Sequence, residues 1–116
     1  MRSTRRTMRA GLAAVMALAA TMAVGPQATA AEPCRANGLC LYYSTGFNDM
    51  RFVTERTGRC SELVRFGLVN HVFSYRNNLP VTVQFLDGDN RPIWSIRPGG
   101  SSSDSRSFGG EVLVCT

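Results

Sequence analysis

The four cysteines constrain this chain more than any other feature, because all of them follow a segment with the pattern of an export signal. They are Cys34, Cys40, Cys60 and Cys115. Outside the reducing cytosol, thiols pair and stay paired. Four such thiols predict two disulfides, for which three pairings are possible. We favour Cys34–Cys40, a short loop that contains Gly38, together with Cys60–Cys115, while the sequence leaves the other pairings open.

The N-terminal segment has the composition of a signal peptide. Residues 1–9 contain four arginines and no acid, and residues 10–24 form an uncharged, alanine-rich apolar run. This run is short for a transmembrane helix, and the small residues Ala28 and Ala30 precede the expected cleavage point. We predict a signal peptide over residues 1–30, cleaved after Ala30 or, as a second choice, after Ala31. The mature chain is then secreted and extracellular, and does not insert into a membrane.

Loss of the signal also removes most of the positive charge. The full chain has 13 basic and 8 acidic residues and a formal charge of +5, and four of the basic residues are the signal arginines. The net charge of residues 31–116 is therefore close to zero, which gives no support for nucleic-acid binding. We expect a single small monomeric domain over residues 31–116. Its marginal core would gain about 2–4 kcal/mol from each disulfide.

Short β-type segments alternate with turn residues along the mature chain. Strands are expected at 39–43, 50–54, 71–77, 81–86, 92–97 and 111–115. Residues 60–66 indicate a short helix or an ordered loop, residues 87–91 a hairpin turn, and the serine-rich residues 98–107 a surface loop. Short strands at this spacing predict an all-β fold, an antiparallel sandwich or barrel.

Few residues have the arrangement that catalysis or a metal site needs. His71 is the only histidine, and its place on an alternating segment beside Phe73 and Tyr75 favours a packed or surface role. The cysteine intervals do not repeat a zinc-binding Cys-x-x-Cys pattern, and no carboxylate pair or nucleophile motif is present. We therefore expect neither an enzyme nor a cofactor. Trp94 is either part of a binding patch or, as is more common for a lone strand tryptophan, part of the core.

Several segments resemble one known family. They are Cys40-Leu41-Tyr42-Tyr43, Gly46-Phe47, Cys60-Ser61-Glu62-Leu63, and Asn70 to Asn77. Their order and spacing resemble the small secreted actinobacterial proteins grouped with the Streptomyces metalloproteinase inhibitor. The resemblance covers residues 34–86. It implies peptidase inhibition and a βγ-crystallin-like fold, in which two Greek-key motifs, at about 39–78 and 81–115, pack as a β-sandwich.

The same resemblance suggests a metal site. The βγ-crystallin calcium motif runs Asn/Asp-Asn/Asp-x-x-Ser/Thr-Ser, and this chain retains Asn70 and Ser74 of it. A bound calcium ion is therefore expected at these two residues, if one binds at all. The disulfide-tied contact loop of the inhibitor family has no counterpart here, because Cys115 is the only cysteine after Cys60.

The leading hypothesis is a secreted, non-enzymatic inhibitor that binds an extracellular peptidase through rigid loops. Rigid loops lose little conformational entropy on binding. The loop residues expected to make the contact are Phe47, Asn48, Asp87, Asp89, Asn90 and Arg91. The alternatives are a calcium-binding βγ-crystallin-like extracellular module and a small secreted antimicrobial toxin.

Overall fold

The computed structural model describes residues 30–116, so the predicted signal peptide up to residue 29 lies outside the described residues. Within 30–116 the chain forms eight strands and one short 3-10 helix. In chain order these are β1 (Leu39–Ser44), β2 (Asn48–Thr54), β3 (Cys60–Glu62), η1 (Leu63–Phe66), β4 (Ser74–Asn77), β5 (Val83–Leu86), β6 (Pro92–Ile96), β7 (Ser101–Ser102) and β8 (Leu113–Cys115).

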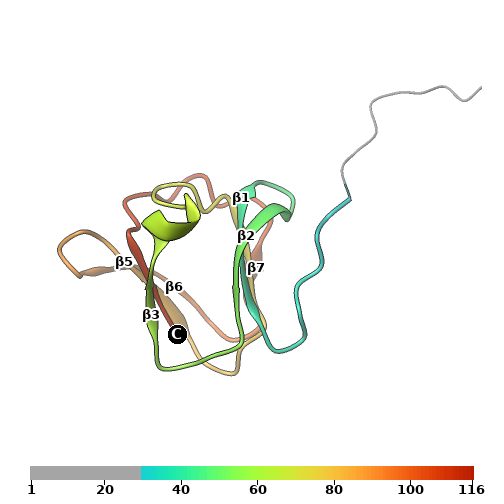
Figure 1. Ribbon diagram of the computed structural model, residues 1–116, viewed down its shortest axis with the longest axis horizontal. Coiled ribbons are helices and arrows are strands. Elements are labelled where there is room, and N and C mark those ends of the chain that lie inside the picture. The colour runs from blue at the N-terminus through green and yellow to red at the C-terminus, as the bar shows by residue number, and fades with distance from the viewer. Residues whose placement is uncertain (1–29) are drawn as a thin grey trace, which may run out of the picture.

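The strands form two four-stranded sheets, with the orders β2-β1-β4-β7 and β3-β8-β5-β6. Every strand pair in them is antiparallel. Figure 1 shows β1, β2 and β7 on one side of the molecule and β3, β5 and β6 on the other. The expected all-β, antiparallel, two-sheet architecture is confirmed.

The strands β1–β4 and β5–β8 form two halves of the chain, and the third strand of each half lies in the sheet of the other half. β3 follows β2 in the chain but pairs with β8, and β7 follows β6 but pairs with β4. The hairpins β1–β2 and β5–β6 also change register at equivalent positions. The change lies between Leu41 and Tyr42 in β1 and between Phe85 and Leu86 in β5. Because of the exchange, neither sheet is complete without strands from both halves.

The core lies between the sheets and draws side chains from both of them. Its buried members are Leu39, Leu41, Phe52, Leu63, Leu68, Val72, Tyr75, Leu79, Val83, Phe85, Ile96 and Val114. Phe52 of β2 meets Phe66 of η1 edge to face, with ring centroids 4.9 Å apart. The short helix η1 therefore covers one end of the core, next to β2.

Both favoured disulfides form. Cys34–Cys40 attaches the N-terminal segment to the start of β1. Cys60–Cys115 joins residues that lie directly opposite each other on β3 and β8. One disulfide therefore holds the segment before β1 against one sheet, and the other links β3 to β8 within the second sheet.

Three segments differ from the expected secondary structure. Residues 60–62 were expected to belong to a short helix or an ordered loop, but they form β3 because they pair with β8. Residues 71–73 were expected to begin a strand, but β4 begins only at Ser74. The N–H of His71 donates to Leu68 O in a turn that contains Asn70 at a φ of 59°, so the backbone cannot be extended there. Residues 98–107 were expected to be a loop, but Ser101 and Ser102 form β7 because they pair with β4.

Candidate functional site

The two loops that carry the expected contact residues lie far apart, and the one with Phe47 and Asn48 lies beside residues 98–107. The N–H of Gly46 donates to Ser103 O at 2.8 Å, so the β1–β2 loop contacts the segment that follows β7. The β5–β6 loop, residues 87–91, projects from the opposite side of the molecule (Figure 1). A partner would therefore meet either the β1–β2 loop with the segment after β7, or the β5–β6 loop.

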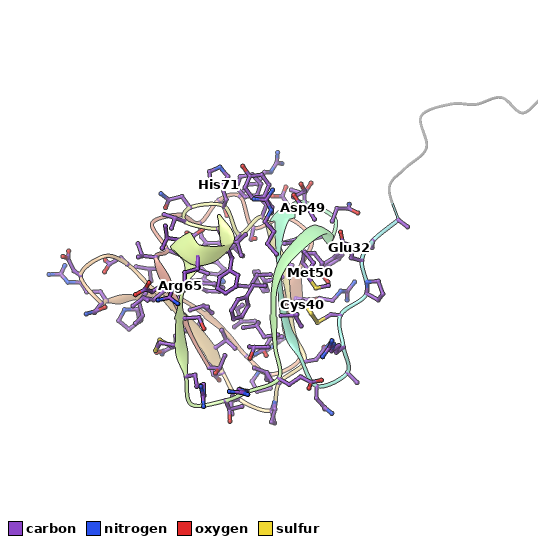
Figure 2. The ribbon with its side chains drawn as sticks, in the orientation of Figure 1. Glu32, Cys40, Asp49, Met50, Arg65 and His71 are labelled. Atoms are coloured by element: carbon purple, nitrogen blue, oxygen red, sulfur yellow. A yellow bond between two sulfur atoms is a disulfide. The ribbon has the colours of Figure 1, made fainter. Side chains whose placement is uncertain are left out.

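The N-terminal segment holds the β1–β2 loop in place. The carboxylate of Glu32 accepts hydrogen bonds from the N–H groups of Asp49 at 3.0 Å and Met50 at 3.1 Å. The N–H of Glu32 donates to Phe47 O, and its carbonyl accepts from the Tyr42 hydroxyl, both at 2.8 Å. Figure 2 shows Glu32 beside Asp49 and Met50 on this side of the molecule. Residues close to the predicted cleavage point are thus part of the folded domain.

The side chains of Phe47 and Asn48 stabilise the conformation of this loop. The guanidinium of Arg76 lies 3.7 Å above the Phe47 ring, and Tyr42 meets the same ring edge to face. Burial raises the pKa of the Tyr42 hydroxyl, and the charge of Arg76 opposes this shift. The amide nitrogen of Asn48 donates to Thr45 O and Gly46 O. Both predicted contact residues are therefore committed to contacts within the domain.

Asn70 and Ser74, the expected calcium ligands, are also engaged in the fold. The amide oxygen of Asn70 accepts from the N–H of Gly110 at 2.5 Å. The hydroxyl of Ser74, which is fully buried, accepts from Phe47 N–H and donates to Ser44 O. In this arrangement both oxygens take part in hydrogen bonds within the domain, and calcium binding at these two residues stays a prediction. Within residues 30–116, no group of three or more His, Cys, Asp and Glu side chains has an arrangement that could hold a metal ion.

Glu111 is a buried carboxylate that the sequence did not single out. It is fully buried, its Oε1 accepts from the N–H of Val72 at 3.3 Å, and its Oε2 has no hydrogen-bond partner among the described residues. Burial raises the pKa of this carboxyl group, and the nearby His71 opposes the shift. The sequence placed Glu111 at the start of the last strand, where an acidic residue is usually exposed.

His71 belongs to a stack of ring and guanidinium groups at one end of the sandwich. Its ring lies parallel to that of Tyr43, with centroids 5.0 Å apart, and its Nδ1 is 2.9 Å from Val69 O. Arg51 lies 3.8 Å from the Tyr43 ring centroid and pairs with Asp49 at 3.0 Å. Figure 2 shows His71 and Asp49 at this end. Packing accounts for the position of His71.

The β5–β6 loop combines a fixed backbone with exposed side chains. Oδ1 of Asp87 accepts from the N–H groups of Asp89 at 2.8 Å and Arg91 at 2.9 Å. These hydrogen bonds, that from Arg91 first, lower the pKa of the Asp87 carboxyl group. Asn90 donates its N–H to Asp87 O and adopts a φ of 62°. Asp89, Asn90 and Arg91 are all exposed.

No protein-family model, curated protein or solved structure matches the chain. Within residues 30–116, no helix has the length and apolar character needed to cross a membrane. The β5–β6 loop is the strongest candidate contact site, because its conformation does not depend on a partner and its side chains are accessible.

Proposed function

We propose that the protein is a secreted peptidase inhibitor that contacts its target mainly through the β5–β6 loop. The observation that carries this proposal is the pair of hydrogen bonds from the loop backbone to Asp87, at 2.8 and 2.9 Å. They fix the loop while Asp89, Asn90 and Arg91 remain exposed. A loop that is ordered before binding loses less conformational entropy in the complex, which favours tight binding.

The disulfides support this function in two ways. Two cross-links in a domain this small are compatible with an extracellular location. A disulfide also restricts the unfolded chain and so lowers the population of unfolded molecules that a peptidase can cleave. Both properties suit a protein that works beside peptidases.

The proposed fold is a pair of Greek keys of the βγ-crystallin kind. Its support is the equivalence of the two halves, which have the local orders β2-β1-β4 and β6-β5-β8 and exchange their third strands. Equivalent hydrogen bonds also recur. Phe73 N–H donates to Tyr42 O before β4 begins, and Val112 N–H donates to Leu86 O before β8 begins. A duplicated four-strand motif accounts for both similarities.

The direct test is an inhibition assay with residues 31–116, purified with both disulfides formed. We expect a micromolar excess of this protein to inhibit a thermolysin-like or a subtilisin-like peptidase. Arg91→Ala should raise the inhibition constant about tenfold, the equivalent of 1.4 kcal/mol. Arg56→Ala is the matched control, because Arg56 is an exposed loop arginine outside the β5–β6 loop.

Two results would contradict the proposal. If the folded protein leaves both peptidase classes fully active, inhibition of these enzymes is excluded. If it inhibits one of them, but Arg91→Ala and Asp89→Ala inhibit as well as the wild type, the contact does not involve the β5–β6 loop. Thermal unfolding of each variant checks that the domain remains folded.

A further inference from the structure

The strand β6 is an exposed edge with apolar side chains. It lies at the end of its sheet, and its residues from Pro92 to Ser95 are all exposed. The side chains of Ile93 and Trp94 are 36% and 40% exposed. Edge strands present unpaired N–H and C=O groups, and proteins usually protect them with lysines, prolines or bulges. In β6 the proline is the first residue and the register shift falls at Ile93, so the regular and unprotected part of the edge runs from Trp94 to Ile96.

A groove lies at the C-terminal end of this strand, beside Ser95 and Ile96. It is lined by residues of β6 and β7, which are edge strands of the two different sheets, and by Tyr75 of β4. The indole N–H of Trp94 donates to the Tyr75 hydroxyl at 3.4 Å, so the proton of that hydroxyl remains for another acceptor. Ser95, Arg97 and Ser101 also line the groove.

Arg97 provides an unpaired positive charge at one end of the groove. The four ion pairs among the described residues involve Arg35, Arg51, Arg65 and Arg106. Arg97 and Arg91 are not among them. The carboxylate of Asp87 accepts hydrogen bonds from the backbone N–H groups of Asp89 and Arg91. Both ends of β6 therefore carry an exposed arginine that can pair with a carboxylate of a ligand.

We propose that β6 binds an extended acidic peptide segment of a partner protein as an additional strand. Main-chain hydrogen bonds to the unpaired edge would supply affinity, and side chains of the added strand would contact Ile93 and Trp94. Carboxylates at the ends of the segment would pair with Arg91 and Arg97. The distance between these arginines along an extended strand is about 20 Å, so a segment of about seven residues is sufficient.

A second copy of this chain fits the edge less well than an acidic peptide does. Arg91 and Arg97 lie at equal sequence distances on either side of Trp94. If two copies paired antiparallel about Trp94, Arg91 of one copy would face Arg97 of the other. Like charges directly opposite each other on paired strands are destabilising. The same positions attract a strand with glutamate or aspartate at both ends.

The test uses the fluorescence of Trp94, which is the only tryptophan of the chain. The probe is a blocked heptapeptide with five alternating valine and threonine residues between two glutamates. We expect its titration into residues 31–116 to give a saturable change in Trp94 emission, with a Kd below about 1 mM. The same peptide with lysine at both ends should bind at least about tenfold more weakly. N-methylation of alternate peptide amides should abolish binding, because it blocks one edge of the added strand.

Charge-reversed variants locate the contact. Arg97→Glu should remove the preference for the glutamate peptide, whereas Arg56→Glu, a charge reversal in an exposed loop elsewhere, should retain it. Equal binding of the lysine or N-methylated peptide, or no saturable change up to about 1 mM, would overturn the proposal. So would concentration-dependent dimerisation without peptide, or binding of an acidic oligosaccharide in place of the peptide. Because Arg97 lies outside the β5–β6 loop, this result does not depend on peptidase inhibition.

Discussion

The backbone N–H of Phe47 donates a hydrogen bond of 3.0 Å to the hydroxyl group of Ser74. That hydroxyl donates in turn to Ser44 O at 2.7 Å. One buried side chain on β4 therefore holds both sides of the β1–β2 loop, in which Phe47 has the left-handed φ of 62°. A left-handed conformation costs a non-glycine residue roughly 1–2 kcal/mol, and the hydrogen bonds of Ser74 offset this cost.

Ser74→Ala should destabilise the domain by about 1–3 kcal/mol, because it leaves two backbone groups without their partner. For a domain of this size, each kcal/mol lowers the Tm by roughly 4–8 °C. Thermal unfolding followed by circular dichroism measures the change. Ser103→Ala is the matched control, since the Ser103 side chain is exposed and its loss should leave the Tm unchanged. Equal Tm values for the two variants would contradict this role of Ser74.

Asn77→Ala should cost more, on the order of 3 kcal/mol or above, because it removes several buried hydrogen bonds at once. The two N–H groups of the Asn77 amide are shared among Val81 O, Ile96 O and Arg97 O at 3.0–3.1 Å, and its oxygen accepts from Leu79 N–H at 3.0 Å. The neighbouring Asn78→Ala serves as the control, because Asn78 makes a single side-chain hydrogen bond, to Arg35 O. Urea unfolding that ranks the two variants equally would contradict the prediction.

Asn77 also illustrates the limit of the sequence-based prediction. Its place at the end of a strand was predicted correctly, because the expected strand 71–77 ends at Asn77, as β4 does. Its role was not, because the carbonyls of Ile96 and Arg97 are brought to it by the tertiary fold. The same holds for β7, whose two serines become a strand only by pairing with β4.

The parts of the fold that were predicted depend on local pattern. Alternating segments and turn residues identified six of the eight strands and the hairpin at 87–91, and the cysteine positions favoured the disulfides that form. The exchange of β3 and β7 between sheets has no local signal. Trp94 shows the same limit at the candidate sites, since a strand tryptophan suggested core, whereas Trp94 is partly exposed on the edge strand β6.

The two disulfides should differ in their contribution to stability. Cys60–Cys115 closes a separation of 55 residues and Cys34–Cys40 one of 6. In the chain-entropy description, these correspond to about 4 and about 2 kcal/mol. Replacing both cysteines of the longer loop with serine should therefore lower the Tm more than the same change at Cys34 and Cys40. Calorimetry of the two double variants measures this difference, and the reverse order would show that native packing around the cysteines outweighs chain entropy.

Glu111→Gln should make the domain more stable at neutral pH. Burial raises the pKa of Glu111 above its ordinary value of 4.5, so the folded state holds the proton more tightly than the unfolded state does. The stabilisation from this proton is complete below the unfolded pKa and is lost as the pH rises through the folded pKa. Glutamine has a similar shape and carries no charge, so the variant avoids the cost of burying a carboxylate.

The advantage of Glu111→Gln should shrink as the pH falls through the raised pKa of the folded state, because the wild-type carboxyl group becomes protonated there. Urea unfolding of both proteins at several pH values gives the difference directly. The carboxyl groups of Asp87 and Asp104 have lowered pKa values and lose their contribution only below about 3.8. Glu55→Gln, at an exposed position, should follow the wild type throughout, and a Glu111→Gln curve that did the same would mean that the buried carboxylate carries no penalty.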